Sequence, residues 1–450
     1  MARKIDVANG PIFKNMLLFA FPIILTGVLQ LLYNAADVIV VGRFAGRNSL
    51  AAVGATSSLT NLLTNLFIGL SVGTNVCIAQ LIGLGGKDSE NYIKKTVHTS
   101  VLIALIGGIA LLLIGVLTSK KLLFLMDTPN EILDESSLYM TIIFLGMPAM
   151  LVYNFGAAVL RACGDTKTPL IYLSISGVLN VILNLVFVIA FKMGAEGVGI
   201  ATIISQYLCA AMIIVFLMKQ DSAIKLYLKE LKIDVKMLKK ILKIGLPAGI
   251  QGIVFSISNV IIQSSINGFG AAAIAGNSAA SSVEGFTYTA MNSFSPTLST
   301  FVGQSYGAGN VKRIKKSVAI GCFQVFAVGI IMSFTTLAFS HQLLGIYSSD
   351  TEVIKSGIER MSIILSTYFL CGIMDTLVGS IRGMGISFLP MCATIFGVCG
   401  IRIAWIYTVF RSFRTLETLY ASYPVSWAAT VIVQIVFLFV AIKRTKEHFA

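Results

Sequence analysis

Long apolar runs separated by short polar segments make up the chain from residue 13 to residue 442. Each run holds about 20 or more mainly apolar residues, the length that an α-helix needs to cross the hydrocarbon core of a bilayer. The runs are much longer than the ~10-residue alternating segments of outer-membrane β-barrels. We therefore predict an all-α polytopic membrane protein. Its twelve transmembrane helices are expected at residues 13–41, 48–76, 94–118, 137–160, 169–191, 196–218, 241–266, 272–302, 317–340, 361–381, 388–410 and 418–442.

The composition supports this interpretation. Of the 450 residues, 56% are hydrophobic and only 12% are charged, and the mean hydropathy is +0.86. A soluble protein carries roughly 25% charged residues. Because the segment before residue 13 is too polar for a cleaved signal peptide, we expect the first helix to remain in the protein.

Lysine and arginine are distributed unevenly between the two sides of the predicted membrane. With a cytoplasmic N-terminus, 24 of the 34 Lys and Arg residues fall on the inside and 9 on the outside, while Arg402 lies within a helix. The positive-inside rule then predicts a multi-pass cell-membrane protein with both termini in the cytoplasm. The formal net charge of +14 lies mostly in short loops beside anionic lipid, so we expect no nucleic-acid binding.

The residues that usually build enzyme and metal sites form no pattern here. The seven cysteines are scattered without a CxxC pair, the three histidines are far apart, and no phosphate-binding P-loop motif is present. We therefore expect no catalytic residues, no metal site and no cofactor. A membrane-embedded enzyme is disfavoured because no Ser–His pair or metal-ligand set occurs in the predicted helices.

The second half of the chain repeats landmarks of the first half. Three residues recur at one constant offset: Pro22, Gly27 and Asn34 correspond to Pro247, Gly252 and Asn259. Each half therefore carries six helices, and an even number gives two parallel repeats, as in transporters whose two lobes move about a central site. We predict an N-lobe at residues 1–218, a cytoplasmic amphipathic linker at 219–240 and a C-lobe at 241–450. We expect the linker to be a surface helix held by anionic headgroups.

Polar side chains in the first half point to a cation site. A charged side chain at the bilayer centre costs at least ~3 kcal/mol, so Asp37 needs partners or must be neutral for part of a cycle. Asn34 and Asp37 share one face of the first helix, Asn180 and Asn184 are an i, i+4 pair, and Thr202 lies in the sixth helix. We predict that these five residues couple H⁺ or Na⁺. The alternatives are an interfacial Asp37 and asparagines that only join helices.

A second polar set lies on other helices and suggests a substrate site or a second coupling site. Its members are Tyr153, Asn154, Glu284, Tyr288, Asp375 and Arg402. We expect Arg402 to pair with Glu284 or Asp375, a choice that the sequence leaves open. The acid left over is a functional candidate because unpaired acids in membrane helices are usually functional. If the coupling ion is Na⁺, it is expected at Asp37 or Glu284.

The order and spacing of several segments resemble a known transporter family. The segments are ADVIVVGRFAGRNSLAAVG, LRACGDTKTP followed by LNVILN, AIAGNSAASSVEGFTYTAMNSF, FVGQSYGAGN and GSIRGMG. Together they resemble bacterial members of the multidrug and toxic compound extrusion (MATE) family, which belongs to the multidrug/oligosaccharidyl-lipid/polysaccharide flippase superfamily. The resemblance covers about residues 13 to 442.

The resemblance implies a V-shaped pair of six-helix lobes and secondary antiport of bulky, often cationic, drugs against Na⁺ or H⁺. Asp37 matches the first-helix aspartate used for cation coupling, and Asn154, Asn180 and Thr202 match its polar neighbours. This chain has Asn184 where several members have aspartate. Other members have aspartate where this chain has Cys371, four residues before Asp375. Glu284 matches an acidic position of close relatives only.

We therefore expect a secondary active multidrug efflux antiporter that works by alternating access of two lobes. Its partners are expected to be small organic cations and the lipid bilayer, and we expect a monomer. The alternative is a flippase for lipid-linked precursors of the same superfamily, which would be expected to have a more cationic central cavity.

Overall fold

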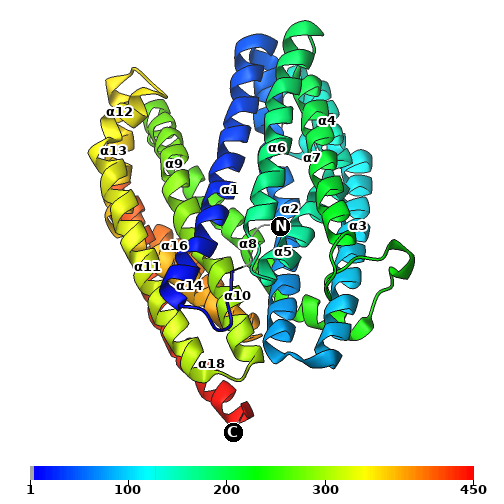
Figure 1. The fold of residues 1–450 in the computed structure, drawn as a ribbon. Coiled ribbons are helices and arrows are strands. Elements are labelled where there is room, and N and C mark those ends of the chain that lie inside the picture. The colour runs from blue at the N-terminus through cyan, green and yellow to red at the C-terminus, as the bar shows by residue number, and fades with distance from the viewer. Residues whose placement is uncertain (1–4, 127, 450) are drawn as a thin grey trace. The chain divides into compact units, whose positions relative to one another are not determined.

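The computed structural model describes residues 5–126 and 128–449, and every element in these ranges is a helix (Figure 1). The side chains of residues 47, 57, 58, 61 and 62 lie outside the description. The first half contains α1 (Ile12–Val40), η1 (Val41–Ala45), α2 (Arg47–Leu84), α3 (Gly86–Leu125), α4 (Asn130–Leu145), α5 (Met147–Ala162), α6 (Lys167–Leu185), η2 (Val186–Ala190) and α7 (Ala195–Met218). The second contains η3 (Leu228–Glu230), α8 (Val235–Asn267), α9 (Ala271–Asn292), α10 (Phe294–Gly307), α11 (Val311–Ala338), α12 (Ser340–Gly345), α13 (Thr351–Thr367), α14 (Phe369–Gly383), α15 (Phe388–Thr394), η4 (Ile395–Gly400), α16 (Ile401–Tyr407), α17 (Val409–Ser412) and α18 (Leu416–Phe449).

The helical, membrane-spanning prediction is confirmed. In the described part of the chain, nine helical segments are long and apolar enough to cross a bilayer, and two bent helix pairs raise the number to eleven. The remaining predicted span, 272–302, corresponds to α9 and α10 and does not reach the same hydropathy. Its sequence is rich in Ala, Gly and Ser, and its buried face includes Asn277 and Glu284. Protein rather than lipid therefore surrounds much of this segment.

Two predicted spans are bent in the middle. The α4–α5 pair bends by 42°, and Pro148 stands in the first turn of α5, where proline ends the preceding helix. The α13–α14 pair bends by 48° without a proline. There the Thr367 hydroxyl donates to the carbonyls of Ile363 and Ile364, each at 3.3 Å, and such back-bonding bends helices.

The chain forms two compact units, one at residues 25–249 and one at residues 5–24 with 250–449. They share most of their residues with the two lobes expected from the sequence. However, the start of α1 belongs to the second unit, and the start of α8 belongs to the first. The two change-over points, after Ile24 and after Gly249, have the same separation along the chain as Pro22 and Pro247. The internal repeat thus extends to where each helix changes unit.

In the first unit, α2 and α8 pack with their backbones in close approach. A Cβ added to Gly69 would overlap the Gly249 backbone, and one added to Gly73 would overlap the Ile241 carbonyl. A Cβ on Gly245 would lie 2.6 Å from the Leu70 Cα. Gly69 and Gly73 thus form a small-residue pair that lets α8 approach α2 closely.

The expected surface helix in the linker is wrong. Between α7 and α8 the only described helical element is the three-residue η3, and the rest is irregular. The linker is held by α3: the Tyr227 N–H donates to His98 Nε2 at 3.1 Å, and the Asp234 N–H donates to Thr99 Oγ1 at 3.0 Å. Ile224 is buried as well. Contacts with α3 therefore hold this segment in an irregular conformation.

Candidate functional site

Asp37 lies in the last turn of α1, directly before a π-helical turn. That turn, η1, runs from Val41 to Ala45 and ends at Gly46, whose φ of 95° suits glycine. A second π-helical turn, η2, begins at Val186, two residues after Asn184, and lies against η1. π-helical turns within α-helices are frequent at functional sites.

Four of the five predicted coupling residues form one closed hydrogen-bond ring. Asn184 Nδ2 donates to Asp37 Oδ1 at 2.5 Å and to Asn180 Oδ1 at 3.3 Å. Asn180 Nδ2 donates to Thr202 Oγ1 at 3.3 Å, and the Thr202 hydroxyl is bonded to Asp37. The i, i+4 spacing on α6 and the packing of α6 on α7 bring these groups together.

The ring places a carboxylate among neutral donors. Asn184 is fully buried, Asn180 is 5% exposed, and no ion pair of Asp37 occurs within residues 5–126 and 128–449. Asn184 Oδ1 is buried without a hydrogen-bond partner. The group can therefore bind a proton on Asp37, or place the Asp37, Asn184 and Thr202 oxygens around a small cation.

Three further predicted residues of the first half lie apart from this ring. Asn34 is exposed on α1, and its side chain has no hydrogen bond to the ring within the described part of the chain. The Tyr153 hydroxyl donates to the Pro169 carbonyl at 3.2 Å, and the Asn154 amide donates to the Met150 carbonyl at 2.9 Å. Both bonds end on backbone carbonyls of helices, so they position side chains rather than join the carboxylate.

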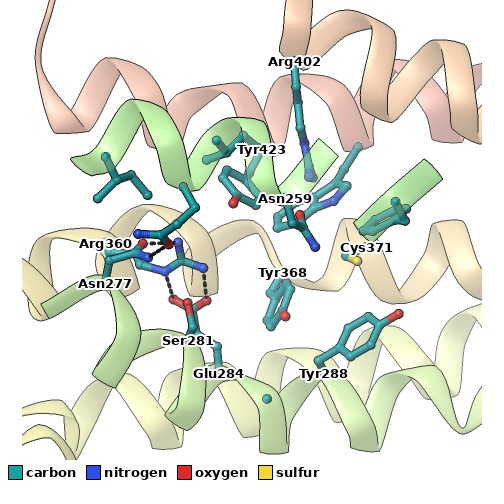
Figure 2. Close-up of a pocket in the computed structure, with 16 residues that line it drawn as sticks. Asn259, Asn277, Ser281, Glu284, Tyr288, Arg360, Tyr368, Cys371, Arg402 and Tyr423 are labelled. Atoms are coloured by element: carbon teal, nitrogen blue, oxygen red, sulfur yellow. Dashed lines mark hydrogen bonds and ion pairs between the residues drawn. The ribbon is translucent and has the colours of Figure 1, made fainter. Parts of the chain in front are cut away.

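The second unit contains a cavity of about 370 Å³ that collects most of the other predicted residues (Figure 2). The α9 face supplies Asn277, Ser281, Glu284 and Tyr288 at helical spacing. The lining is completed by Phe255, Asn259, Ile262, Gln263, Ile266, Gly285, Arg360, Tyr368, Cys371, Arg402, Tyr423 and Trp427. Its size and its mixture of aromatic and polar walls are typical of a site for a small organic molecule.

Glu284 is paired with Arg360. The expected pairing of Glu284 with Arg402 is therefore wrong. Arg360 donates from Nε to Glu284 Oε1 at 3.1 Å and from Nη2 to Oε2 at 2.8 Å. Its Nη1 donates to Asn277 Oδ1 at 2.6 Å. Each Glu284 oxygen accepts a hydrogen bond from Arg360, and this guanidinium already balances the carboxylate charge, which disfavours Na⁺ at Glu284 (Figure 2).

Arg402 has a different environment and no acidic partner within the described ranges. Its Nε donates to Ser426 Oγ at 3.0 Å, and its Cζ lies 4.1 Å from the Tyr423 ring centroid. The rings of Phe255 and Trp427 lie 5.7 Å from it. The expected pairing of Arg402 with an acid is therefore wrong, and cation–π contacts take its place.

Asp375 is bonded to Tyr288, which also lines the cavity. Its Oδ2 atom is buried without a hydrogen-bond partner among the described residues. Asp375 itself is not among the lining residues. Tyr288 therefore stands between this acid and the cavity.

Arg360 was not predicted, because the tenth span was expected to begin at residue 361, which leaves residue 360 in a loop. The helix α13 begins earlier, at Thr351, and packs against α9, so Arg360 becomes 6% exposed. Apolar residues recur at helical spacing from residue 353 to residue 365, and this pattern could have predicted that the helix includes residue 360. Arg402 contacts the rings of Tyr423 and Trp427. Nothing in the sequence except their aromatic type indicated that these two residues would be its partners.

The chain is similar to proteins with multidrug resistance and export names. It is 28% identical over 433 residues to a probable multidrug resistance protein, YoeA, from Bacillus subtilis, covering 94% of this chain and 92% of that protein. It is 22% identical over 381 residues to the multidrug export protein MepA of Staphylococcus saprophyticus, covering 84% and 83%. A solved structure described as the outward-facing conformation of a multidrug resistance MATE family transporter has a TM-score of 0.91, with 21% identity and 99% of both chains covered.

The MatE family profile matches the chain twice, at residues 22–186 and at residues 247–408. The two matches begin at Pro22 and at Pro247, the first pair of the internal repeat, so the repeat is confirmed independently. The matched residues make up well over half of the chain. This all-helical membrane protein belongs to the MatE family, the multidrug and toxic compound extrusion transporters.

Proposed function

We propose that the protein is a secondary antiporter that exports hydrophobic organic compounds, organic cations among them, in exchange for H⁺ or Na⁺. The names of the relatives, which include multidrug resistance and export proteins, support the efflux role. The observation that carries the coupling role is the Asp37 carboxylate held by Asn184 and Thr202 with no basic partner among the described residues.

The hydrogen-bond ring explains how binding of the coupling ion at Asp37 could change the contacts that hold α1. In the charged state Asp37 accepts from Asn184 and Thr202, which offsets part of its desolvation. Binding of a proton removes the charge that these donors stabilise, so α1 is less firmly held to α6 and α7. The two adjoining π-helical turns, η1 and η2, are the irregular backbone at which these helices can repack.

The same change alters the attraction for a substrate. A deprotonated Asp37 presents a negative charge that attracts an organic cation, and a protonated Asp37 does not. Cation entry from outside and substrate release thus compete for one carboxylate, which is the requirement for exchange in opposite directions. Na⁺ at Asp37 would act in the same way, with Asn184 Oδ1 as a free oxygen ligand.

Asp375 is the second acid in this proposal. Its Oδ2 has no hydrogen-bond partner among the described residues, so it can take up a further proton. Glu284, fixed by two bonds from Arg360, shapes the cavity and carries no ion.

The test is uptake of ethidium into proteoliposomes under an imposed pH gradient or an imposed Na⁺ gradient. Wild type, Asp37→Asn and the control Asp88→Asn, an exposed acid in the first turn of α3, are compared. We expect flux with one gradient in wild type and the control, and loss of that flux in Asp37→Asn. Flux that survives in Asp37→Asn moves coupling to Asp375. No flux in wild type under either gradient overturns antiport of cations and favours the flippase alternative.

A further inference from the structure

Arg402 is a buried cation that the protein does not neutralise. It is 1% exposed, and the two acids that the sequence suggested as its partners have other partners: Glu284 has Arg360, and Asp375 has Tyr288. Removing a guanidinium from water without a counter-charge is unfavourable, and cation–π contacts offset only part of that penalty. A compensating anion is therefore missing from the protein itself.

Two buried N–H donors at this cavity lack partners. Arg402 Nη1 and Trp427 Nε1 are both buried without a hydrogen bond, and both residues line the cavity. Neither group can accept a hydrogen bond, since guanidinium and indole nitrogens only donate. The indole ring centroid lies 5.7 Å from Arg402 Cζ, so the two donors belong to neighbouring side chains of one cavity. The complement of two unpartnered donors and a positive charge is an oxyanion.

The rest of the cavity indicates the body of the ligand. In Figure 2 the Arg402 side chain extends toward Asn259, and no dashed line joins it to the Glu284–Arg360 pair. Aromatic rings of Phe255, Tyr288 and Tyr368 form further walls. A cavity of about 370 Å³ is far larger than an inorganic ion needs, and its rings suit a flat apolar body.

We propose that this cavity binds the carboxylate of an aromatic amphiphile, with the carboxylate between Arg402 Nη1 and Trp427 Nε1. The substrates then include acids and zwitterions as well as cations. The identification of the bound compound as a transported one rests on the proposed export function, whereas the binding site itself does not.

The experiment measures energy transfer from Trp427 to dansylglycine, in detergent and without any ion gradient. The chain has two tryptophans, so a Trp405→Phe background leaves Trp427 as the only donor. The neutral methyl ester of dansylglycine is the matched ligand, and Arg444→Gln, which removes an exposed positive charge near the C-terminus, is the matched variant.

We expect the acid to bind roughly tenfold or more tightly than the ester, and Arg402→Gln to abolish that difference, because a charge-assisted hydrogen bond is lost. Ester binding should survive in Arg402→Gln, which shows that the cavity is intact, and Arg444→Gln should retain the preference. Equal binding of acid and ester by the parent, or a preference retained in Arg402→Gln, overturns the proposal.

A second variant covers the case in which Arg402→Gln does not fold. Trp427→Phe keeps the ring and removes the N–H donor, and dansyl anisotropy replaces energy transfer as the signal. We expect a loss of several-fold in affinity for the acid alone. An unchanged affinity for the acid overturns the role of Trp427. Because binding needs no transport, a protein that binds the acid but moves no ethidium contradicts the antiport proposal and leaves this site standing.

Discussion

The Glu284–Arg360 pair allows a quantitative test of the second unit's packing. The Arg360 and Glu284 side chains are 8% and 4% exposed, and three hydrogen bonds of 2.6–3.1 Å hold Arg360 to Glu284 and Asn277. Glu284→Gln keeps the side-chain shape but removes the negative charge. It leaves Arg360 as an uncompensated buried cation, and breaking such a pair costs about 3–5 kcal/mol. For a domain of ~200 residues this corresponds to a fall in apparent Tm of roughly 6–20 °C.

The assay is thermal unfolding in detergent, followed by the loss of monodisperse protein after heating. Arg360→Met should cost less than Glu284→Gln, because the Glu284 carboxyl that remains can bind a proton and become neutral. The double variant Glu284→Leu with Arg360→Met removes both charges. It should recover much of the lost stability, since replacing a buried ion pair with apolar residues is often close to neutral.

The reasoning depends on the charge and not on side-chain volume. A Glu284→Gln variant within 2–3 °C of wild type (about 1 kcal/mol by the same conversion) would refute it. A double variant as unstable as the sum of the two single variants would refute it equally, because uncoupled residues add.

Two smaller predictions concern the first unit. Gly69→Ala should destabilise the protein by about 1–3 kcal/mol, because a Cβ there overlaps the Gly249 backbone. Gly54→Ala, on the same helix, places its Cβ where nothing lies within 4 Å, so it should be neutral or slightly stabilising. Equal thermal stability of the two variants would contradict the close approach of α2 and α8. Hydrogen bonds from the Met237 N–H and, to a smaller extent, from Lys95 hold the pKa of Asp234 below its usual range. The Asp234 carboxylate therefore stabilises the first turn of α8 above about pH 4, and this stabilisation is lost as the pH falls below that value. Asp234→Ala should therefore weaken hydrogen-exchange protection of that turn by about 1 kcal/mol at pH 7 and by much less at pH 3; a loss that does not change with pH contradicts the charge-dependent cap.

The fold was largely predictable because bilayer insertion leaves few options. In lipid every backbone polar group must be satisfied within the segment, so long apolar runs can only be helices. The correspondence between Pro22 and Pro247 was visible without coordinates, and the family profile matches the two halves from these same positions. The linker was predicted incorrectly because its amphipathic pattern fits a helix on a membrane as well as an irregular segment bound to α3.

The Asp37 ring was predictable only in part, unlike the fold, which was largely predicted, and the linker, which was predicted incorrectly. Helical spacing placed Asn180 and Asn184 on one face, and that spacing is a local property of α6. The residues that the ring joins, Asp37 and Asn184, are 147 positions apart, so only the packing of α1, α6 and α7 determines which polar groups meet. Asn34, on the same helix as Asp37, is exposed and lies outside the ring, because a shared stripe does not make two side chains reach the same partner.

The sequence by itself determined the helices, the repeat and the membrane setting, because each depends on residue type and local spacing. The tertiary structure alone decided the partners of the buried charges. Arg360 pairs with Glu284 across 76 positions, and Arg402 is left with aromatic rings and no acid among the described residues. The energy of a buried ion pair depends steeply on distance and dielectric, and both are set by how α9, α13, α16 and α18 pack.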